Sequence, residues 1–407
     1  MNDYIDSIRK DFPVLSALVE GHSLVYLDNG ASAQKPQVMI DAVSEFYSQY
    51  YSNIHRSAHT LSRMATTAYE AARDTAKKYF NVPDTAEVVY TRGTTESLNI
   101  VAACFGQKVL KKNDVVVVSE MEHHANLVPW QEVCKKTGAV LKLAKIDECG
   151  ALSLESLEEI FRQGGVKIVS IAHCSNVLGT VNDVCKISEM CRQYNAYFSV
   201  DAAQSAPHFL DDFAATGADF MSLSAHKCYG PTGFGLLIAK KSVFELMDVY
   251  QCGGDMVDYV DWQYATYKKA PEKFEAGSQH IAGAIGFMAS LNYLSKLDKA
   301  KIKQNEAQIT EFLTERLSDI KGLRVLGGAK NRLPIFSFVH ESAAAYDIAA
   351  LLDTTGIALR SGNHCAQPLG RLLNAPVSCR ASFGLYNTLG EAEYFASQLE
   401  HALKVLA

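Results

Sequence analysis

The chain has 407 residues, and its 48% hydrophobic and 21% charged content indicates an ordinary globular protein. A net charge of −6 without a long Lys/Arg block argues against nucleic-acid binding. No apolar run is long enough to span a membrane, and the first residues lack the layout of a signal peptide, so we expect a cytoplasmic protein. The ten cysteines show no Cys-x-x-Cys spacing, which predicts reduced thiols and no metal cluster.

Short apolar runs alternate with helical patterns from about Glu87 onward. The runs predict strands at residues 88–90, 115–118, 140–143, 166–171, 196–200, 219–223 and 233–238. Helices are expected between them at residues 94–105, 127–136, 154–162 and 184–194. Strands that are apolar throughout are typical of a sheet buried on both faces, so we predict an α/β fold with a mostly parallel central sheet.

The pattern changes beyond about Asn292. We expect one long helix over residues 294–317, strands at 323–326 and 335–339, and helices at 346–354 and 389–405. This indicates a smaller α+β domain, joined to the first by the long helix. The predicted division is a large domain over residues 24–292 and a small domain formed by residues 1–23 and 293–407.

Two side chains at strand ends indicate a cofactor. Asp201 ends one apolar run, and Lys227 lies just beyond the next. A lysine that holds an aldehyde and a carboxylate that keeps a pyridine nitrogen protonated are what pyridoxal phosphate requires. Gln204 is placed to donate to an oxygen on the ring. Taken alone, a lysine after a strand is usually a solvated surface group.

A phosphate site is expected where residues 92–96, Arg-Gly-Thr-Thr-Glu, join a strand to a helix. Backbone amides and hydroxyl groups of Thr94 and Thr95 at a helix N-terminus favour an anion, although a plain N-cap explains the same pattern. Ser224 and His226 flank Lys227 closely enough to be further phosphate ligands. No Gly-x-Gly-x-x-Gly or P-loop motif competes with this interpretation.

Two more polar groups follow strands. His124, in Glu-His-His-Ala-Asn at 122–126, is predicted to stack on the pyridine ring and to serve as an acid or base. Asn176 follows the next strand and is predicted to reach the ring oxygen or a substrate carboxylate. A histidine pair is more often structural or metal-binding, but no third ligand stands at metal spacing. Ligands of open α/β sheets bind at the carboxyl ends of strands, which favours a joint site.

Together the motifs carry a family resemblance. Leu-Asp-Asn at 27–29, Gly-Thr-Thr-Glu at 93–96, Glu-His-His-Ala-Asn at 122–126, Asp-Ala-Ala-Gln at 201–204 and Ser-Ala-His-Lys at 224–227 resemble the class V aminotransferase group of fold-type-I pyridoxal enzymes. Within this group the chain is similar to the cysteine desulfurase and selenocysteine lyase branch. The resemblance extends from Tyr26 to Asn387.

One cysteine decides the expected reaction. Cys365 lies in a polar loop, residues 360–368, where Arg360 or His364 would stabilise a thiolate, although alone it is one cysteine of ten. The loop resembles the short active-site loop of the second desulfurase group, which serves the SUF pathway. The resemblance implies that Cys365 attacks the sulfur of bound cysteine, becomes a persulfide and leaves alanine.

The resemblance also implies substrate and partner contacts. Arg380 is the predicted bidentate clamp for the substrate carboxylate, and four further residues are expected at the substrate: Arg360, Gly30, Ala31 and His55. Gly277 and Ser278 resemble a segment that reaches the cofactor phosphate of a partner subunit, and His55 and Arg56 resemble another segment that crosses the interface, which predicts a homodimer. Gly30 departs from an alanine common at its position, and Asn363 from a common histidine.

The sequence therefore predicts a pyridoxal-phosphate-dependent cysteine desulfurase that converts L-cysteine to L-alanine and passes sulfur to an acceptor protein for iron-sulfur cluster assembly. Three alternatives stay open: a selenocysteine lyase, a kynureninase-like hydrolase of the same group, and a non-catalytic scaffold for sulfur transfer. Kynureninase chemistry needs no loop cysteine, and a scaffold needs neither Lys227 nor Asp201.

Overall fold

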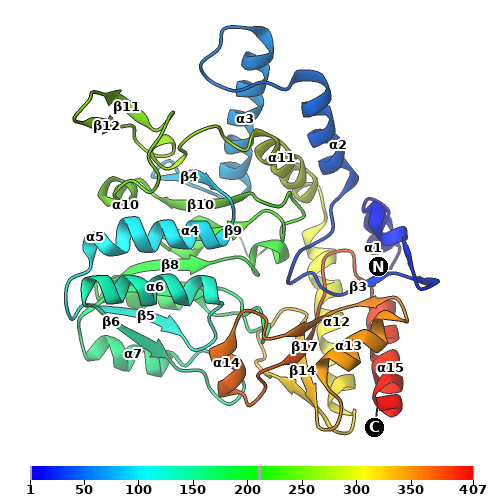
Figure 1. Ribbon diagram of the computed structural model, residues 1–407. Coiled ribbons are helices and arrows are strands. Elements are labelled where there is room, and N and C mark those ends of the chain that lie inside the picture. Colours follow the sequence, from blue (N-terminus) through cyan, green and yellow to red (C-terminus); the bar gives the residue numbers. More distant parts are fainter. Residues whose placement is uncertain (1, 210–211, 407) are drawn as a thin grey trace.

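The computed structural model describes residues 2–209 and 212–406 and contains a large central sheet beside a smaller one (Figure 1). The central sheet has seven strands in the order β4-β10-β9-β8-β7-β5-β6. The strands are β4 (Ala86–Thr91), β5 (Val115–Ser119), β6 (Val140–Ala144), β7 (Val166–Ala172), β8 (Tyr197–Asp201), β9 (Phe220–Ser224) and β10 (Gly235–Lys240).

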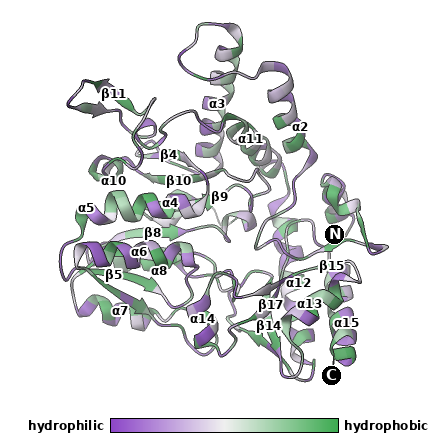
Figure 2. Cartoon of the chain, in the orientation of Figure 1, coloured by the Kyte–Doolittle hydropathy of each residue, from purple (hydrophilic) through white to green (hydrophobic). Residues whose placement is uncertain are grey.

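The central sheet is mostly parallel, as predicted. β10 alone runs against its neighbours β4 and β9, and the other neighbouring pairs are parallel. β4, β5, β8 and β9 have no exposed residue, and β5 and β8 are coloured as hydrophobic in Figure 2. Burial on both faces explains why these strands read as continuous apolar runs. The carboxyl ends of β4, β5, β7, β8 and β9 consequently meet at one edge.

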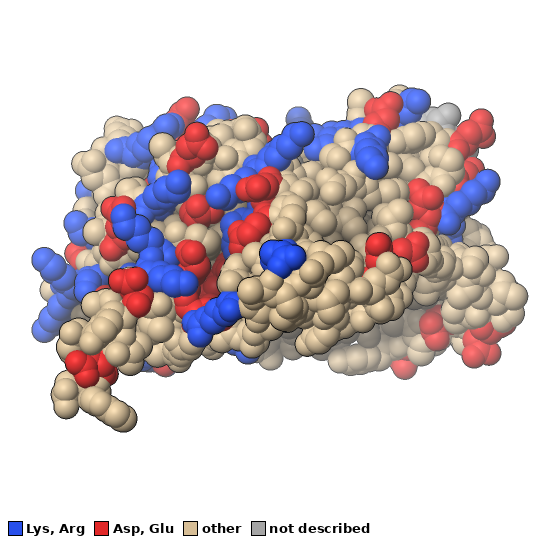
Figure 3. All heavy atoms as spheres, turned by 90° about the horizontal axis from the view of Figure 1, so that it is seen from above, with Lys and Arg blue, Asp and Glu red and all other residues tan. Residues whose placement is uncertain are grey.

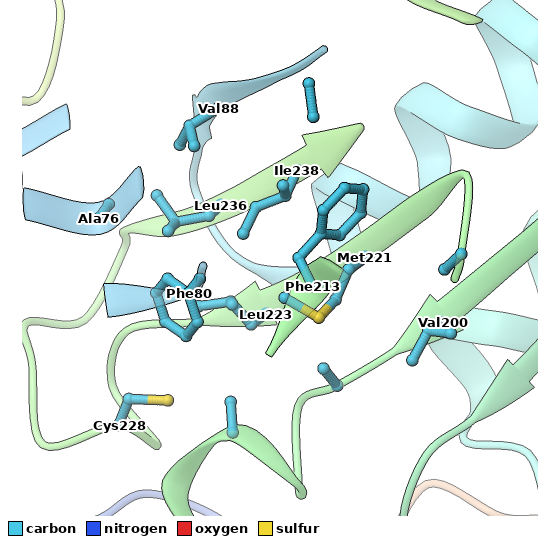
Figure 4. Close-up of a cluster of buried hydrophobic side chains, with 14 of the residues drawn as sticks. Ala76, Phe80, Val88, Val200, Phe213, Met221, Leu223, Cys228, Leu236 and Ile238 are labelled. Atoms are coloured by element: carbon cyan, nitrogen blue, oxygen red, sulfur yellow. The ribbon is translucent and has the colours of Figure 1, made fainter. Parts of the chain in front are cut away.

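Helices cover both faces of this sheet. One face packs against α3 (Thr60–Tyr79), α7 (Leu154–Arg162), α8 (Val184–Gln193) and α11 (Ile281–Ser295). The other face packs against α4 (Thr94–Ile100), the π-helix η3 (Val101–Gly106), α6 (His124–Thr137) and α10 (Lys241–Leu246). The helix predicted over 94–105 thus changes from α to π geometry at Val101. Figure 4 shows part of the first core, where Phe80 and Met221 lie among strand side chains.

The smaller sheet has the strand order β13-β14-β17-β16. Its strands are β13 (Leu323–Leu326), β14 (Ile335–His340), β16 (Arg360–Gly362) and β17 (Ser378–Ser382). It shares a core with α12 (Lys299–Ser318), α13 (Ala345–Asp353) and α15 (Leu389–Leu406). β3 (Val25–Tyr26) pairs in parallel with β15 (Ile357–Ala358), so the chain near residue 25 packs with this C-terminal part. The predicted domain boundaries stay a proposal.

The prediction of a single long helix over residues 294–317 is wrong. α11 ends at Ser295 and α12 starts at Lys299. The side chain of Asp298 accepts a hydrogen bond from the backbone N–H of Lys301 and so caps the second helix. The joint is therefore a break between two helices.

Elements before Glu87 and around residue 260 were not predicted. They include α1 (Asn2–Arg9), η1 (Pro13–Ser16), β1 (Leu18–Val19), β2 (His22–Ser23), α2 (Gln37–Glu45), the π-helix η2 (Phe46–Tyr50), β11 (Val257–Val260) and β12 (Ala265–Tyr267). Short helices complete the fold: α5 (Gln107–Val109), η4 (Ala206–His208), α9 (Phe213–Thr216), η5 (Glu272–Phe274) and α14 (Gln367–Leu372). No helix within the described residues is long and apolar enough to cross a membrane.

Candidate active site

A cavity of ≈ 390 Å³ lies at the carboxyl edge of the central sheet, against the smaller sheet. Most side chains predicted for the site line it: Gly30, Ala31, Thr94, Thr95, Asn176, Asp201, Gln204, Ser224, His226, Lys227, Arg360, Cys365 and Arg380. Cavities of this size that combine apolar walls with convergent polar groups are typical ligand sites. The structure thus brings residues from both parts of the chain into one pocket.

Lys227 and Asp201 form the charged centre of the cavity wall. Burial lowers the pKa of the Lys227 amine from 10.5 to about 8, although Asp201 opposes the shift. Burial also raises the pKa of the Asp201 carboxyl, which accepts a hydrogen bond from the N–H of Ala203 at 2.9 Å. An amine of lowered pKa suits attack on an aldehyde, and a buried carboxylate suits a cationic ring nitrogen. The pair therefore fits pyridoxal phosphate.

The expected phosphate end lies where β4 meets α4. The backbone N–H of Thr94 donates to Ser224 Oγ at 2.8 Å, and the two hydroxyl groups are also 2.8 Å apart. Gly93 has φ 147°, a left-handed conformation that favours glycine and turns the chain into the helix. Hydroxyls and a helix N-terminus thus converge as an anion site requires.

The structure separates the two neighbouring histidines. His123 lines the cavity, and His124 does not. His123 caps α6 by accepting from the N–H of Ala125 at 3.0 Å. Burial, together with Lys227, lowers the pKa of His123 to about 4, so its ring is neutral near pH 7. The cavity wall therefore contains His123 and not His124, and the contact of either ring with the cofactor stays a prediction.

His124 instead holds the loop that carries Cys365. Its backbone N–H donates to the carbonyl oxygen of Cys365 at 2.8 Å, and its Nε2 accepts from the N–H of Gln367 at 3.1 Å. From the other side, Asn176 Nδ2 donates to the carbonyl oxygen of His364 at 2.7 Å. The Cys365 side chain is exposed and lines the cavity. These contacts position the thiol instead of leaving it on a free loop.

Backbone conformation adds to this positioning. His364 and Cys365 both have positive φ, 51° and 54°. Such conformations are uncommon for residues with side chains and persist only where surrounding contacts hold them. The His364 ring bonds to Ser378, and burial lowers its pKa to about 3. A neutral His364 cannot supply the positive charge that we expected beside Cys365, and the same role for Arg360 stays a prediction.

Two arginines and one carboxylate form another wall of the cavity. Arg360 Nη2 is 2.9 Å from Asp28 Oδ2, and Arg380 Nη2 is 3.4 Å from Asp28 Oδ1. Arg380 Nη1 also donates to the carbonyl oxygen of Asn176 at 3.0 Å. A Cβ atom at Gly30 would lie 3.1 Å from Arg380 Cζ, so the glycine leaves room for the guanidinium.

Two predicted cofactor ligands have other partners in this structure. Gln204 Nε2 donates to the carbonyl oxygen of Gly30 at 2.7 Å. His226 Nδ1 lies 3.2 Å from Ser32 Oγ, and burial lowers the His226 pKa to about 4. Both side chains still line the cavity. Their proposed contacts to the cofactor stay predictions.

Besides His124, three predicted residues lie outside this cavity. His55 Nε2 is 2.9 Å from Glu70 Oε1 on α3. Gly277 and Ser278 follow η5, where the N–H of Gly277 donates to the carbonyl oxygen of Gly254. These residues were expected to act across a subunit interface, and that role stays a prediction.

Several residues of the wall were not predicted from the sequence. Asp28 and His123 stood in quoted motifs without an assigned role, and their place beside Arg360 and Lys227 follows from tertiary contacts. Ala125 and Ala203 also lie in motifs of the resemblance without an assigned role, and the remaining wall residues were in none of them: Tyr26, Ser32, Ala172, Cys174 and Thr232.

Comparison with known proteins identifies the class. The model of the family described as aminotransferase class-V matches residues 25–395, and the chain belongs to this family. A relative from Halalkalibacterium halodurans, named probable cysteine desulfurase, is 42% identical and covers 97% of this chain and 96% of its own length. A Staphylococcus aureus protein of the same name is 41% identical, covering 98% of this chain and 96% of itself.

Solved structures agree with the fold. A cysteine desulfurase from Escherichia coli superposes with a TM-score of 0.91 at 34% identity and covers 99% of both chains. A cysteine desulfurase from Thermococcus onnurineus NA1 gives a TM-score of 0.92 at 33% identity over 98% of both chains. The predictions of a fold-type-I pyridoxal-phosphate enzyme and of its family are confirmed.

Proposed function

We propose that this protein is a cysteine desulfurase that releases the sulfur of L-cysteine, leaves L-alanine and carries the sulfur on Cys365. The observation that supports this most directly is the exposed Cys365 thiol in the wall of the cavity that holds Lys227 and Arg380. The names of the relatives point the same way.

Pyridoxal phosphate supplies an aldehyde for the substrate amine and a ring that absorbs carbanion charge. In our proposal Lys227 holds the aldehyde, Asp201 keeps the ring nitrogen protonated, and Thr94, Thr95 and Ser224 bind the phosphate. His123, neutral and facing the cavity, orients the ring and exchanges protons with the substrate.

Arg380 and Arg360 bind the substrate carboxylate and so orient the cysteine sulfur toward Cys365. The thiolate forms a bond to that sulfur while the carbon–sulfur bond of the substrate breaks. The electron pair of the broken bond stays with the carbon skeleton. The contacts of His124 and Asn176 to the loop keep the attacking atom in place.

A bound persulfide requires an acceptor, and we propose a protein thiol as the acceptor, with iron-sulfur cluster assembly as the use of the sulfur. We further propose a homodimer with two-fold contacts. Exposed apolar side chains on α2, on η2 and its C-cap, and on α3 support an interface there: Val38, Ile40, Tyr47, Tyr51, Leu61 and Met64. Figure 3 shows this end of the molecule, with a broad region that carries few charged residues.

The test is mass spectrometry after one turnover with cysteine. We expect the mass of one sulfur atom on the peptide that contains Cys365, and alanine in equal amount. Cys365→Ser should retain cofactor and lose at least about a hundredfold in sulfur release, because only the nucleophile is removed. Cys149→Ser, which changes an exposed thiol outside the cavity, is the matched control.

The alternatives give other results. A kynureninase-like hydrolase keeps its activity in Cys365→Ser, and a scaffold releases no alanine. A selenocysteine lyase processes selenocysteine in Cys365→Ser, because a carbon–selenium bond is weaker than a carbon–sulfur bond. Added sulfur on Cys174 or Cys379 would show that the desulfurase mechanism is wrong.

A further inference from the structure

A second cavity, of ≈ 580 Å³, lies between α12 and the segment 328–334. Its wall shares no residue with the wall of the active-site cavity. The segment that carries Asn176 into the active-site cavity carries Val181 into this one. Ligand sites are usually concave and of this size, and they lie preferentially where separate parts of a fold meet. The cavity is therefore a second place where a small molecule fits.

Arg332 in this wall has only neutral partners. Its Nη2 donates to the carbonyl oxygen of Ile335 at 2.6 Å, and its Nη1 donates to that of Gly327 at 3.5 Å. The guanidinium also lies 4.4 Å from the centre of the Phe336 ring. Burial lowers the pKa of Arg332 to about 10, and the Cys174 thiol opposes this shift. Arg332 is therefore positively charged near pH 7.

Other arginines of similar burial have a carboxylate partner. Within residues 2–209 and 212–406, four more arginines are buried or half-buried, and each forms an ion pair: Arg9 with Glu391, Arg73 with Glu275, Arg316 with Glu400 and Arg380 with Asp28. In the same part of the chain, no carboxylate forms an ion pair with the half-buried Arg332. A charge that is partly removed from water and has no counter-ion is costly, so a negative group from outside the chain is favoured there.

The acidic residues of the cavity wall do not supply this negative group. Glu306 is engaged by His208, whose Nδ1 lies 2.7 Å from its Oε1. Glu311 and Glu315 are exposed on α12, and neither pairs with Arg332. Because these two carboxylates repel a doubly charged phosphate more than a singly charged carboxylate, the wall favours an anion with one charge.

The rest of the wall suits a carboxylate with an organic group attached. The exposed Lys330 adds a second cation two residues from Arg332. Ala329, Leu333 and Pro334 are buried and provide an apolar surface in the same segment. We propose that this cavity binds a small organic monocarboxylate, with the carboxylate on Arg332 and Lys330 and the organic group against Leu333 and Pro334.

The test is a titration of the cofactor-loaded protein with para-fluorobenzoate, followed by fluorine NMR. We expect saturable binding that becomes about tenfold weaker in Arg332→Gln, because a charge-assisted contact to the carboxylate is lost. Arg324→Gln is the matched control, since Arg324 is exposed outside the cavity and also donates to backbone carbonyl oxygens. Affinity should be unchanged in this control. The cofactor absorbance, recorded in parallel, should not change, because the active-site cavity stays free of the probe.

Two exposed side chains test the proposal even if Arg332→Gln does not fold. We expect the affinity to fall about twofold in Lys330→Gln and to rise about twofold in Glu311→Gln, since exposed charges contribute little. No saturable binding, an unchanged affinity in folded Arg332→Gln, or shifts of the same sign in the two exposed variants overturns the proposal. Displacement of the probe by inorganic phosphate at lower concentration than by propionate overturns the assignment to carboxylates. No step of this test needs sulfur release, so its result is independent of the proposed desulfurase activity.

Discussion

At the scale of single residues, the neighbouring histidines have different tasks. His123 is the N-cap of α6 with an extended backbone, and His124 is the first residue of the helix, so the two side chains leave the chain in different directions. His123 faces the cavity, whereas His124 bonds to the Cys365 loop. The sequence Glu-His-His-Ala-Asn does not indicate which histidine faces the cavity and which contacts the Cys365 loop.

This division gives a prediction. His123→Ala should lower kcat by about a hundredfold, the usual contribution of one acid–base group, and should alter the absorbance of the bound cofactor. His124→Ala should leave that absorbance unchanged and slow mainly the sulfur step, because the loop loses an anchor. Steady-state kinetics and spectra of both variants provide the check. Equal spectral changes in the two would contradict the assignment.

The Lys227 amine gives a prediction about pH. Its pKa is lowered from 10.5 to about 8 in the folded protein, so between these values the unfolded chain holds more protons. Stability of the cofactor-free protein should therefore rise with pH from 8 to 10.5, by no more than about 3 kcal/mol. Urea unfolding of wild type and Lys227→Met across this range measures the difference. The gain should be smaller in the variant, in which Lys35, whose pKa burial also lowers to about 8, still contributes.

At the scale of elements, a buried ion pair fixes the segment after η5. Glu275 accepts from Arg73 Nη1 at 2.8 Å and Nη2 at 2.9 Å, from the Tyr90 N–H at 2.7 Å and from the Tyr69 hydroxyl at 3.1 Å. Arg73 lies on α3 and Tyr90 on β4. The pair therefore ties a helix and an edge strand to the chain that leads to Gly277 and Ser278.

Removing one partner leaves a buried charge uncompensated. Arg73→Met and Glu275→Gln should each lower the free energy of unfolding by about 3–5 kcal/mol. The double variant should lose less than the sum, because neither charge remains alone. Urea denaturation of the three variants tests this. Additive losses would mean that the pair is not coupled.

At the scale of the whole molecule, the apolar side chains at the α2–α3 end are unusual for a free surface. Tyr47, Tyr51 and Met64 are 57%, 59% and 47% exposed. Contiguous apolar surface of this kind is typical of protein interfaces. Figure 1 places this end opposite the C-terminal helix α15.

A charge at this surface should separate the proposed dimer. We expect Tyr51→Glu/Met64→Glu to sediment as a monomer, because burying two carboxylates in an apolar interface is costly. Val405→Glu, an equally exposed apolar position on α15, should remain dimeric. Sedimentation velocity at micromolar concentration distinguishes the two. A monomeric wild-type protein with full activity would rule out the dimer.

Much of the site could be predicted because the fold makes it regular. In a parallel sheet, residues just after successive strands meet at one edge. This rule predicts that Thr94, Asn176, Asp201 and Lys227 lie close together, and all four line the cavity. The break near Asp298 could also have been found, since aspartate is a preferred N-cap.

By itself the sequence determined the central sheet and the cofactor chemistry, because these depend on local periodicity and on residue types at strand ends, and its five motifs indicated the family by resemblance. Tertiary structure alone decided which histidine faces the cavity and that Asp28 meets Arg360, 332 residues further along the chain. Side-chain direction at a helix start and contacts between distant segments depend on packing. The linear order of residues does not contain this packing information.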